Sequence, residues 1–313
     1  MNDIAKVTNK FHFTLYADDT SLIEPLCTFT GDIANGKVIS DQINSELQQI
    51  FEWLSVNKLS LNVKKTKMMV FHHRQRNIQD MIPQLHLDGI PIERVKQFNF
   101  LGIVLDEHMT WNPHTNKVAC SIARTIGTLK RLKRFLPMSI LKTLYNSLIL
   151  PHLSYGILSW GPKSNRLLKL QKWAIRTVTN SKYNAHTDPI FKKLGLLKIH
   201  DIYKSTALKV YFKYKNDKVP SYFKELFSVS YQFHDHDTRN RNQPRFYQTN
   251  TALAKASVRY YVPRLIHTTP NIVTDKINTH SMHGFSAYVK NYFIGLYQSD
   301  CLLQNCYICQ KEN

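Results

Sequence analysis

The sequence predicts an α+β protein, in which a partial antiparallel sheet with a packed helix is followed by an all-helical bundle. Before residue 108, short runs of alternating apolar and polar residues have the period of half-buried strands. From Trp111 onward, apolar residues recur at helical spacing, as at Val118, Ile122 and Ile126. With 313 residues and 43% hydrophobic content, the chain can bury a sizeable core.

The first element is a predicted β-hairpin over residues 11–23. Apolar residues alternate with polar ones up to Asp18 and Asp19, and the apolar pair Leu22 and Ile23 follows. Adjacent carboxylates repel each other unless a cation joins them, and Mg²⁺ prefers oxygen ligands. Carboxylates that clamp two metal ions about 3.5–4 Å apart perform phosphoryl transfer. The simpler alternative is a polar turn, because Asp is a favoured turn residue.

A helix is expected next, over residues 40–59, with Ser40 as its N-cap. Its apolar stripe comprises Ile43, Leu47, Ile50, Phe51 and Leu54. A lysine-rich loop over residues 58–67 follows, and then a strand over residues 67–72.

The end of the sheet region holds two further strand signals. Asp88 and Gly89, between two short apolar runs, predict a tight hairpin turn. Residues 97–105 read as one more strand, in which Gly102 marks a bulge or a close backbone approach.

The helical part begins with residues 111–134 and continues with helices over residues 140–150, 165–181, 189–197 and 199–214, with helical patches at 252–265 and 285–296. The first helix ends in a basic cluster, and the helix over 165–181 carries a basic stripe at i, i+3, i+6 and i+10. These candidate phosphate-binding residues are Lys130, Arg131, Lys133, Arg134, Arg166, Lys169, Lys172 and Arg176. Basic residues in a last turn also stabilise the helix dipole, and a cationic stripe can simply face solvent.

The charge distribution favours a polyanionic partner. The chain carries a net charge of +20, yet residues 1–59 hold 8 acidic and 4 basic residues. Acidic residues near the Asp pair and basic residues downstream suit an enzyme that acts on nucleic acid. A solvated basic surface is the alternative interpretation.

Three motifs resemble the palm of reverse transcriptases encoded by jockey-like non-LTR retrotransposons. They are Tyr16-Ala17-Asp18-Asp19, an "LN..KT" loop over residues 61–71, and an "FLG" hairpin over residues 98–103, in that order. The resemblance extends to about residue 230 and implies a palm remnant over residues 1–108, a thumb-like helical domain over 109–230 and an extension over 231–313. It further implies that Asp18 and Asp19 bind the metal ions, that Lys65 protonates the leaving pyrophosphate, and that Tyr16, Ala17, Leu101 and Gly102 lie beside the primer terminus.

By the same resemblance, the intact enzyme would use Mg²⁺ or Mn²⁺, an RNA template, a DNA primer and dNTPs. Only 17 residues precede Asp18, too few for the earlier metal-binding Asp and the fingers of such an enzyme. We therefore expect an N-terminal half of the polyprotein as a partner and no polymerisation by this chain alone. The alternatives are a stand-alone nucleic-acid-binding module with a relic active site, or a helical interaction scaffold.

The cysteine count and the hydropathy of the sequence bear on where in the cell the protein is found. Five cysteines, no signal peptide and no apolar run of 18 residues predict an intracellular protein, nuclear or cytoplasmic, without a membrane partner. Cys301, Cys306 and Cys309 supply three thiolates where a zinc knuckle needs four ligands, and we expect no zinc site there.

Overall fold

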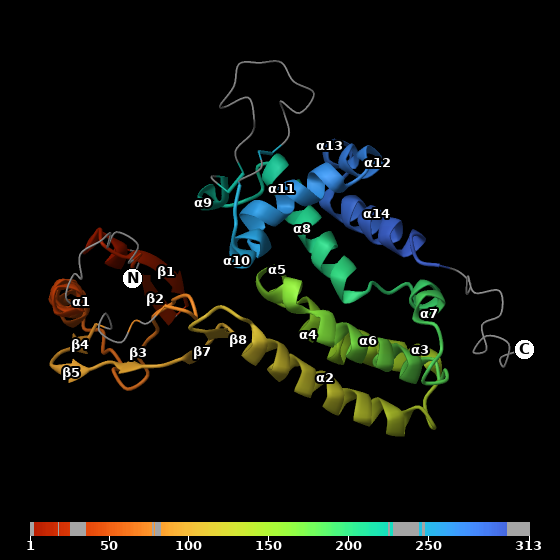
Figure 1. Cartoon of the computed structure of the whole chain (residues 1–313), viewed down its shortest axis with the longest axis horizontal. Helices are drawn as coiled ribbons and strands as arrows, with labels where there is room; N and C mark the ends of the chain where they lie inside the picture. The colour runs from red at the N-terminus through yellow and green to blue at the C-terminus, as the bar shows by residue number, and fades with distance from the viewer. Residues whose placement is uncertain are drawn as a thin grey trace, which may run out of the picture. The chain divides into compact units, whose positions relative to one another are not determined.

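The computed structural model describes residues 3–17, 19–25, 36–76, 78, 83–224, 226–227, 244–245 and 248–298. The chain divides into two compact units, Met1–Thr110 and Trp111–Asn313 (Figure 1). The boundary expected near residue 230 lies outside the described residues and stays a prediction.

The first unit is built on α1 (Gly36–Val56). The predicted apolar stripe is confirmed, because its members pack in one cluster with Ile39 and with Ile4 of the short 3₁₀ helix Ile4–Lys6. The strand residues Phe13 and Leu22 pack against the same cluster. Burial of this helix face therefore anchors the hairpin that carries the Asp pair.

The described strands are short and form four separate two-stranded ladders. They are β1 (His12–Tyr16) with β2 (Asp19–Ile23), β3 (Lys67–Met68) with β6 (Glu93–Arg94), β4 (His86–Leu87) with β5 (Ile90–Pro91), and β7 (Gln97–Phe100) with β8 (Ile103–Asp106). Three ladders are antiparallel and the β3–β6 ladder is parallel. The mixed α/β class is thus confirmed, but within the described residues the strands do not join into one antiparallel sheet.

Two tight turns define the later ladders. Asp88 and Gly89 have φ values of +51° and +72° and connect β4 to β5, which confirms the predicted hairpin. Leu101 and Gly102, at +45° and +83°, connect β7 to β8. The single strand expected over residues 97–105 was wrong, because the chain reverses at Leu101 and Gly102, whereas the hairpin that the resemblance implied over residues 98–103 is confirmed.

Two local expectations in the first unit were also wrong. The helix begins at Gly36, so Ser40 is not its N-cap; the Ser40 hydroxyl instead accepts a hydrogen bond from the Gln84 amide at 2.9 Å. The strand expected over residues 67–72 is limited to Lys67–Met68. Beyond Met68 the chain is held by the bond from the His72 amide to the Glu107 carbonyl, at 3.0 Å.

The second unit is helical throughout its described elements. They are α2 (Asn112–Leu132), α3 (Met138–Leu148), α4 (Leu150–Ser154), α5 (Ile157–Trp160), the 3₁₀ turn Gly161–Lys163, α6 (Asn165–Val178), α7 (Thr187–Leu194), α8 (Ile199–Lys215), α9 (Ser221–Lys224), α10 (Ala252–Ala256), α11 (Val258–Thr268), α12 (Asn271–Thr274), α13 (Lys276–Thr279) and α14 (Met282–Gly295). In Figure 1, α2 and α6 run side by side, and α11 and α14 flank α8, in agreement with their contacts.

A buried glutamine ties three parts of this unit together. Gln171 of α6 is fully buried and donates hydrogen bonds to the Tyr145 hydroxyl (2.9 Å) and the Leu197 carbonyl (2.8 Å). Its carbonyl accepts from the Ile199 amide, at 2.8 Å, where α8 begins. Burial raises the pKa of Tyr145 to about 12. The side chain of Gln171 thus positions α3 and α8 relative to α6.

Gly161 lets the 3₁₀ turn pack closely against α8, since a Cβ atom at this position would lie 2.5 Å from the Tyr203 ring on α8. Among the described residues, no helix combines the length and apolar character needed to cross a membrane.

Candidate functional site

The hairpin formed by β1 and β2 is tight. Tyr16 pairs with Asp19, so only residues 17 and 18 connect the strands. Ala17 has a φ of +53°, a left-handed conformation that costs a non-glycine residue roughly 1–2 kcal/mol. Asp18 itself lies outside the described residues. Strained backbone of this kind is concentrated at functional sites.

The described part of the hairpin tip is open to solvent. Tyr16 is 62% exposed. Asp19, the first residue of β2, is exposed, and its carboxylate has no hydrogen bond or ion pair with any described residue. A carboxylate held on a strand and left free in this way can accept a cation from solution.

Asn62 organises the loop that presents Lys65. The Asn62 carbonyl accepts from the Lys65 amide (3.0 Å) and from the Thr66 hydroxyl (3.2 Å), and its side-chain oxygen also faces the Lys65 amide, at 3.3 Å. The side chain of Lys65 is exposed. These bonds give a physical reason for Asn and Thr at their spacing in the "LN..KT" loop, because they fold the turn around the lysine.

The two described members of the expected catalytic set, Asp19 and Lys65, both belong to the first unit. In the described part of the chain, no hydrogen bond or ion pair connects Asp19 to Lys65. Leu101 and Gly102 form the turn between β7 and β8. The roles assigned to these residues, and to Tyr16 and Ala17, stay predictions.

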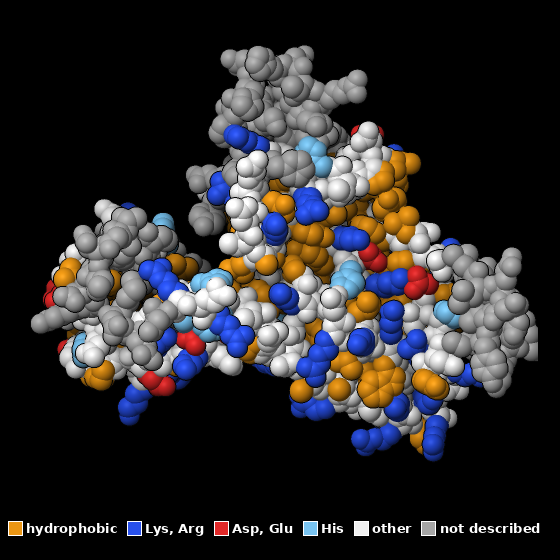
Figure 2. Space-filling model, viewed as in Figure 1, with side chains coloured by type: hydrophobic (Ala, Val, Ile, Leu, Met, Phe, Trp, Pro, Cys, Tyr) orange, Lys and Arg blue, Asp and Glu red, His pale blue; other side chains and the backbone are white. Residues whose placement is uncertain are grey.

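The helical unit carries an unbroken stretch of positive charge. From Trp111 to Thr187 the sequence contains thirteen Lys and Arg residues and no Asp or Glu. Lys and Arg side chains are spread over the face of this unit near α2 and α6 (Figure 2). Without acidic neighbours to neutralise them, such cations produce a positive potential that attracts a phosphate backbone.

Within the cluster that ends α2, the cations differ in their surroundings. Lys130, Arg131 and Arg134 are exposed. The Lys130 ammonium lies 4.4 Å from the centre of the Trp173 ring, in cation–π geometry. Lys133 donates to the Asn180 side chain at 2.8 Å. The exposed members are the ones best placed to meet a ligand.

The four basic residues of the stripe on α6 also differ in their exposure to solvent. Arg166 and Lys169 are exposed, whereas Lys172 and Arg176 are half-buried. Arg176 donates to the Ala185 carbonyl at 2.9 Å, and burial lowers its pKa, so part of its role is to hold the chain after α6. Phosphate contact by all four residues stays a prediction.

A groove of about 310 Å³ runs between α2 and α6 beside the exposed end of this stripe. Small residues of α2 form its floor: Ala119, Cys120 and Ala123. Arg166 and Lys169 line it from α6. The sequence signal for the groove is the run of small residues at helical spacing opposite the basic stripe, which the sequence analysis did not use.

A larger pocket, of about 500 Å³, lies where the 3₁₀ turn, α8, α10 and α11 meet. Its lining includes His200, Tyr203, Lys204, Lys255 and Tyr261. Burial lowers the pKa of His200 despite the neighbouring Asp201. The ring nitrogen Nδ1 of His200 lies 3.2 Å from the hydroxyl of buried Ser164, so this histidine also has a structural contact.

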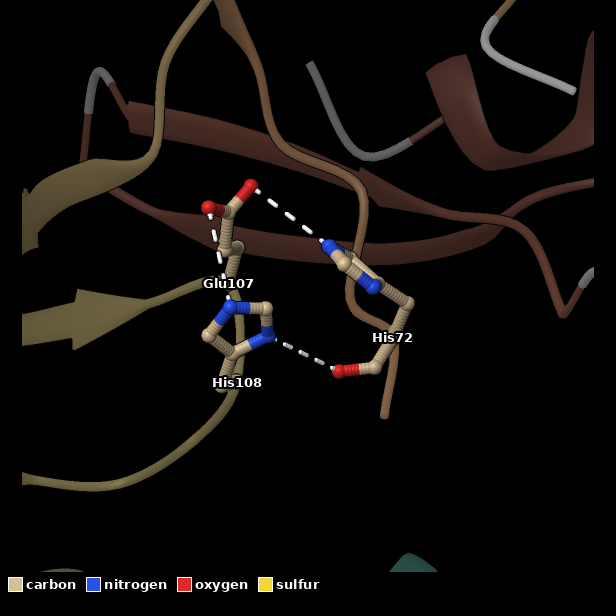
Figure 3. A group of neighbouring side chains, drawn as sticks. All are labelled: His72, Glu107 and His108. Atoms are coloured by element: carbon tan, nitrogen blue, oxygen red, sulfur yellow. Dashed lines mark hydrogen bonds and ion pairs between the residues drawn. The ribbon is translucent and has the colours of Figure 1, made fainter. Parts of the chain in front are cut away.

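The cysteines Cys301, Cys306 and Cys309 lie outside the described residues, so the expectation of no zinc there stays a prediction. Sequence analysis missed a cluster that the structure forms from His72, Glu107 and His108 (Figure 3).

Comparisons with known proteins bear on the resemblance to reverse transcriptases. The chain is 24% identical to a Drosophila melanogaster protein named as the probable RNA-directed DNA polymerase from transposon BS, over 188 residues that make up 58% of the chain. Over 201 residues, 62% of the chain, it is 22% identical to the RNA-directed DNA polymerase from mobile element jockey, also of Drosophila melanogaster. The resemblance to jockey-like reverse transcriptases is thereby confirmed.

These matches cover 20% and 21% of the two relatives, so the chain spans about a fifth of their length. No family model matches the chain, and no solved structure matches it at a significant level.

Proposed function

We propose that this chain, which is similar to the RNA-directed DNA polymerases of jockey-like retrotransposons, supplies the metal-binding hairpin and the duplex-holding helices of such an enzyme. The observation that carries the proposal is the tight turn at Tyr16-Ala17-Asp18-Asp19, where the polymerase motif coincides with a strained two-residue hairpin. The first unit then acts as the palm remnant and the helical unit as the thumb.

In this proposal, Asp18 and Asp19 contribute oxygen ligands to divalent cations, Mg²⁺ or Mn²⁺. The ions would neutralise the triphosphate of a dNTP and activate the primer 3′-hydroxyl for in-line attack. Lys65, exposed on its Asn62-organised turn, would donate a proton to the leaving pyrophosphate. Tyr16, Ala17, Leu101 and Gly102 would lie beside the primer terminus.

The helical unit would hold the RNA template and DNA primer through their phosphates. The acid-free stretch over residues 111–187 supports this role, and the exposed cations on α2 and α6 are the contacts we propose. Such contacts position a duplex without reading its sequence, as a polymerase requires.

A stand-alone binding module with a relic active site is the second candidate. The observation that favours it is the number of exposed cations on α2 and α6, which could hold a phosphate backbone without any contribution from the hairpin. The two candidates share the duplex-binding surface and differ in what the hairpin does.

The test is retention of a labelled RNA–DNA primer–template by the full chain, with and without Mg²⁺, in the wild type and in Asp18→Asn/Asp19→Asn. The polymerase proposal predicts that Mg²⁺ strengthens retention of the primer–template in the wild type and has no such effect in the double variant. Binding that ignores both Mg²⁺ and the substitution would support the binding module. If no duplex is retained at low salt, both candidates are wrong and a helical scaffold is left.

A further inference from the structure

A cluster of two histidines and one glutamate forms where the segment after β3 meets the end of β8. His72 comes from that segment, and Glu107 and His108 directly follow Asp106, the last residue of β8. The two segments are fixed by the backbone bond from the His72 amide to the Glu107 carbonyl, at 3.0 Å. The side chain of Asp106 accepts from the Thr110 amide at 2.9 Å and holds the turn that carries Glu107 and His108.

The donor atoms of the cluster converge. The Nε2 atom of His72 lies 3.7 Å from one oxygen of Glu107, and the Nε2 atom of His108 lies 3.9 Å from the other. One potential ligand atom from each residue lies within 4.8 Å of the others. Figure 3 shows both imidazole rings turned toward the carboxylate. Ligands of a tetrahedral zinc ion stand about 3.3 Å apart, so small side-chain rotations would close the set around an ion.

The other ring nitrogens are engaged in a way that suits metal binding. The Nδ1 atom of His72 lies 3.1 Å from the His73 carbonyl, and that of His108 lies 3.2 Å from the His72 carbonyl. A carbonyl can only accept, so each Nδ1 donates the proton, and in the neutral imidazole the lone pair is then on Nε2. Metal-binding histidines are oriented by this kind of hydrogen bond to a backbone carbonyl or carboxylate.

Arg94 holds the glutamate through Oε2, the oxygen that also faces His72. Its guanidinium lies 3.0 Å from Oε2 of Glu107, whose side chain is only 12% exposed. The ion pair fixes the orientation of the Glu107 carboxylate through Oε2, while Oε1 is left for an ion. The side chains of His72 and His108 are 13% and 25% exposed, so an ion could reach the cluster from solvent.

From this geometry we propose that His72, Glu107 and His108 bind a transition-metal ion of the zinc class. Two imidazole nitrogens and one carboxylate are the donor set that Zn²⁺ accepts, whereas Mg²⁺ prefers oxygen ligands throughout. Three protein ligands leave one coordination position for water. The site differs in its ligand chemistry from the Asp18–Asp19 pair and does not depend on the proposed polymerase function.

The bound ion links two segments that are distant in the sequence. His72 follows the strand that leaves the Lys65 loop, and Glu107 and His108 follow the hairpin whose turn is Leu101–Gly102. In the described structure, the short ladders give these segments few hydrogen bonds. The metal therefore stabilises the first unit at the place where two of its short strands end.

The experiment is a competition titration of the full, metal-free chain with Zn²⁺ against a chromophoric chelator, at neutral pH. The wild type should bind one Zn²⁺ at this site, and each of His72→Gln, Glu107→Gln and His108→Gln should weaken that binding by about 100-fold or more. The matched control is His73→Gln, which replaces an exposed neighbouring histidine and keeps the backbone carbonyl. A rise in Tm on Zn²⁺ addition should be present in the control and lost in the three ligand variants.

Substitution with Co²⁺ separates this site from the cysteines, because thiolate ligands give charge-transfer bands in the near ultraviolet. The proposal predicts visible absorption from nitrogen and oxygen coordination that disappears in Glu107→Gln. Zinc affinity unchanged in all three ligand variants would overturn the proposal, and so would the absence of binding at micromolar Zn²⁺. A cobalt spectrum with thiolate bands alone would equally refute it.

Discussion

The double variant Arg166→Gln/Lys169→Gln removes two cations that the proposed duplex surface depends on. Both are exposed, line the groove between α2 and α6, and lie on a helix with no acidic residue. If each contacts one phosphate, counterion release assigns about 0.9 to each in the slope of log K against log salt. The variant should therefore have a slope smaller by about 1.8. At 0.1 M salt this corresponds to an affinity lower by on the order of 60-fold.

The assay is fluorescence anisotropy with an RNA–DNA hybrid, titrated from about 0.05 to 0.3 M salt. Lys213→Gln is the matched control, since Lys213 is an exposed cation in the last turn of α8 and does not line the groove between α2 and α6. The slope of log K against log salt for this control should fall by less than half of the value assigned to one phosphate contact. If the double variant keeps the slope of the wild type while both remain folded by circular dichroism, α6 does not lie along the phosphates and this reasoning is wrong.

Two further predictions concern stability. Gln171→Leu should lower the free energy of unfolding by about 3 kcal/mol in chemical denaturation, because it strands the buried amide of Ile199 and the hydroxyl of Tyr145; a loss below about 1 kcal/mol would contradict this. Burial lowers the pKa of His114 and of His200, so the unfolded chain binds more protons as the pH falls below about 6.5. Stability should be full above that pH and decrease toward pH 5, less steeply in His200→Gln; a Tm that is constant from pH 7 to 5 would argue against it.

Local patterns predicted the elements whose determinants are local. The stripe on α1 follows from apolar residues at a period of 3.6, and the Asp88–Gly89 turn follows from residues that tolerate positive φ. The reversal at Leu101 has no signal in the local residue pattern, because leucine rarely adopts positive φ, and it was expected only from the resemblance to the family's "FLG" hairpin.

The candidate sites divide in the same way. The Asp18–Asp19 pair is adjacent in sequence, and its motif could be recognised directly. The cluster of His72, Glu107 and His108 depends on the register between two distant segments, set by the bond from the His72 amide to the Glu107 carbonyl. Hydrophobic alternation gives no register in strands this short, so the sequence could not bring the three residues together.

The central claim is that the hairpin holds metal ions at the primer terminus of a duplex bound by the helical unit. Its most direct test loads the full chain and a primer–template with Fe²⁺ in place of Mg²⁺ and maps the cuts that locally generated hydroxyl radicals make in the DNA. The account predicts cuts centred on the primer 3′ end, lost in Asp18→Asn/Asp19→Asn and retained in Glu107→Gln. Bound duplex with cuts spread evenly, or unchanged in the aspartate variant, would contradict it.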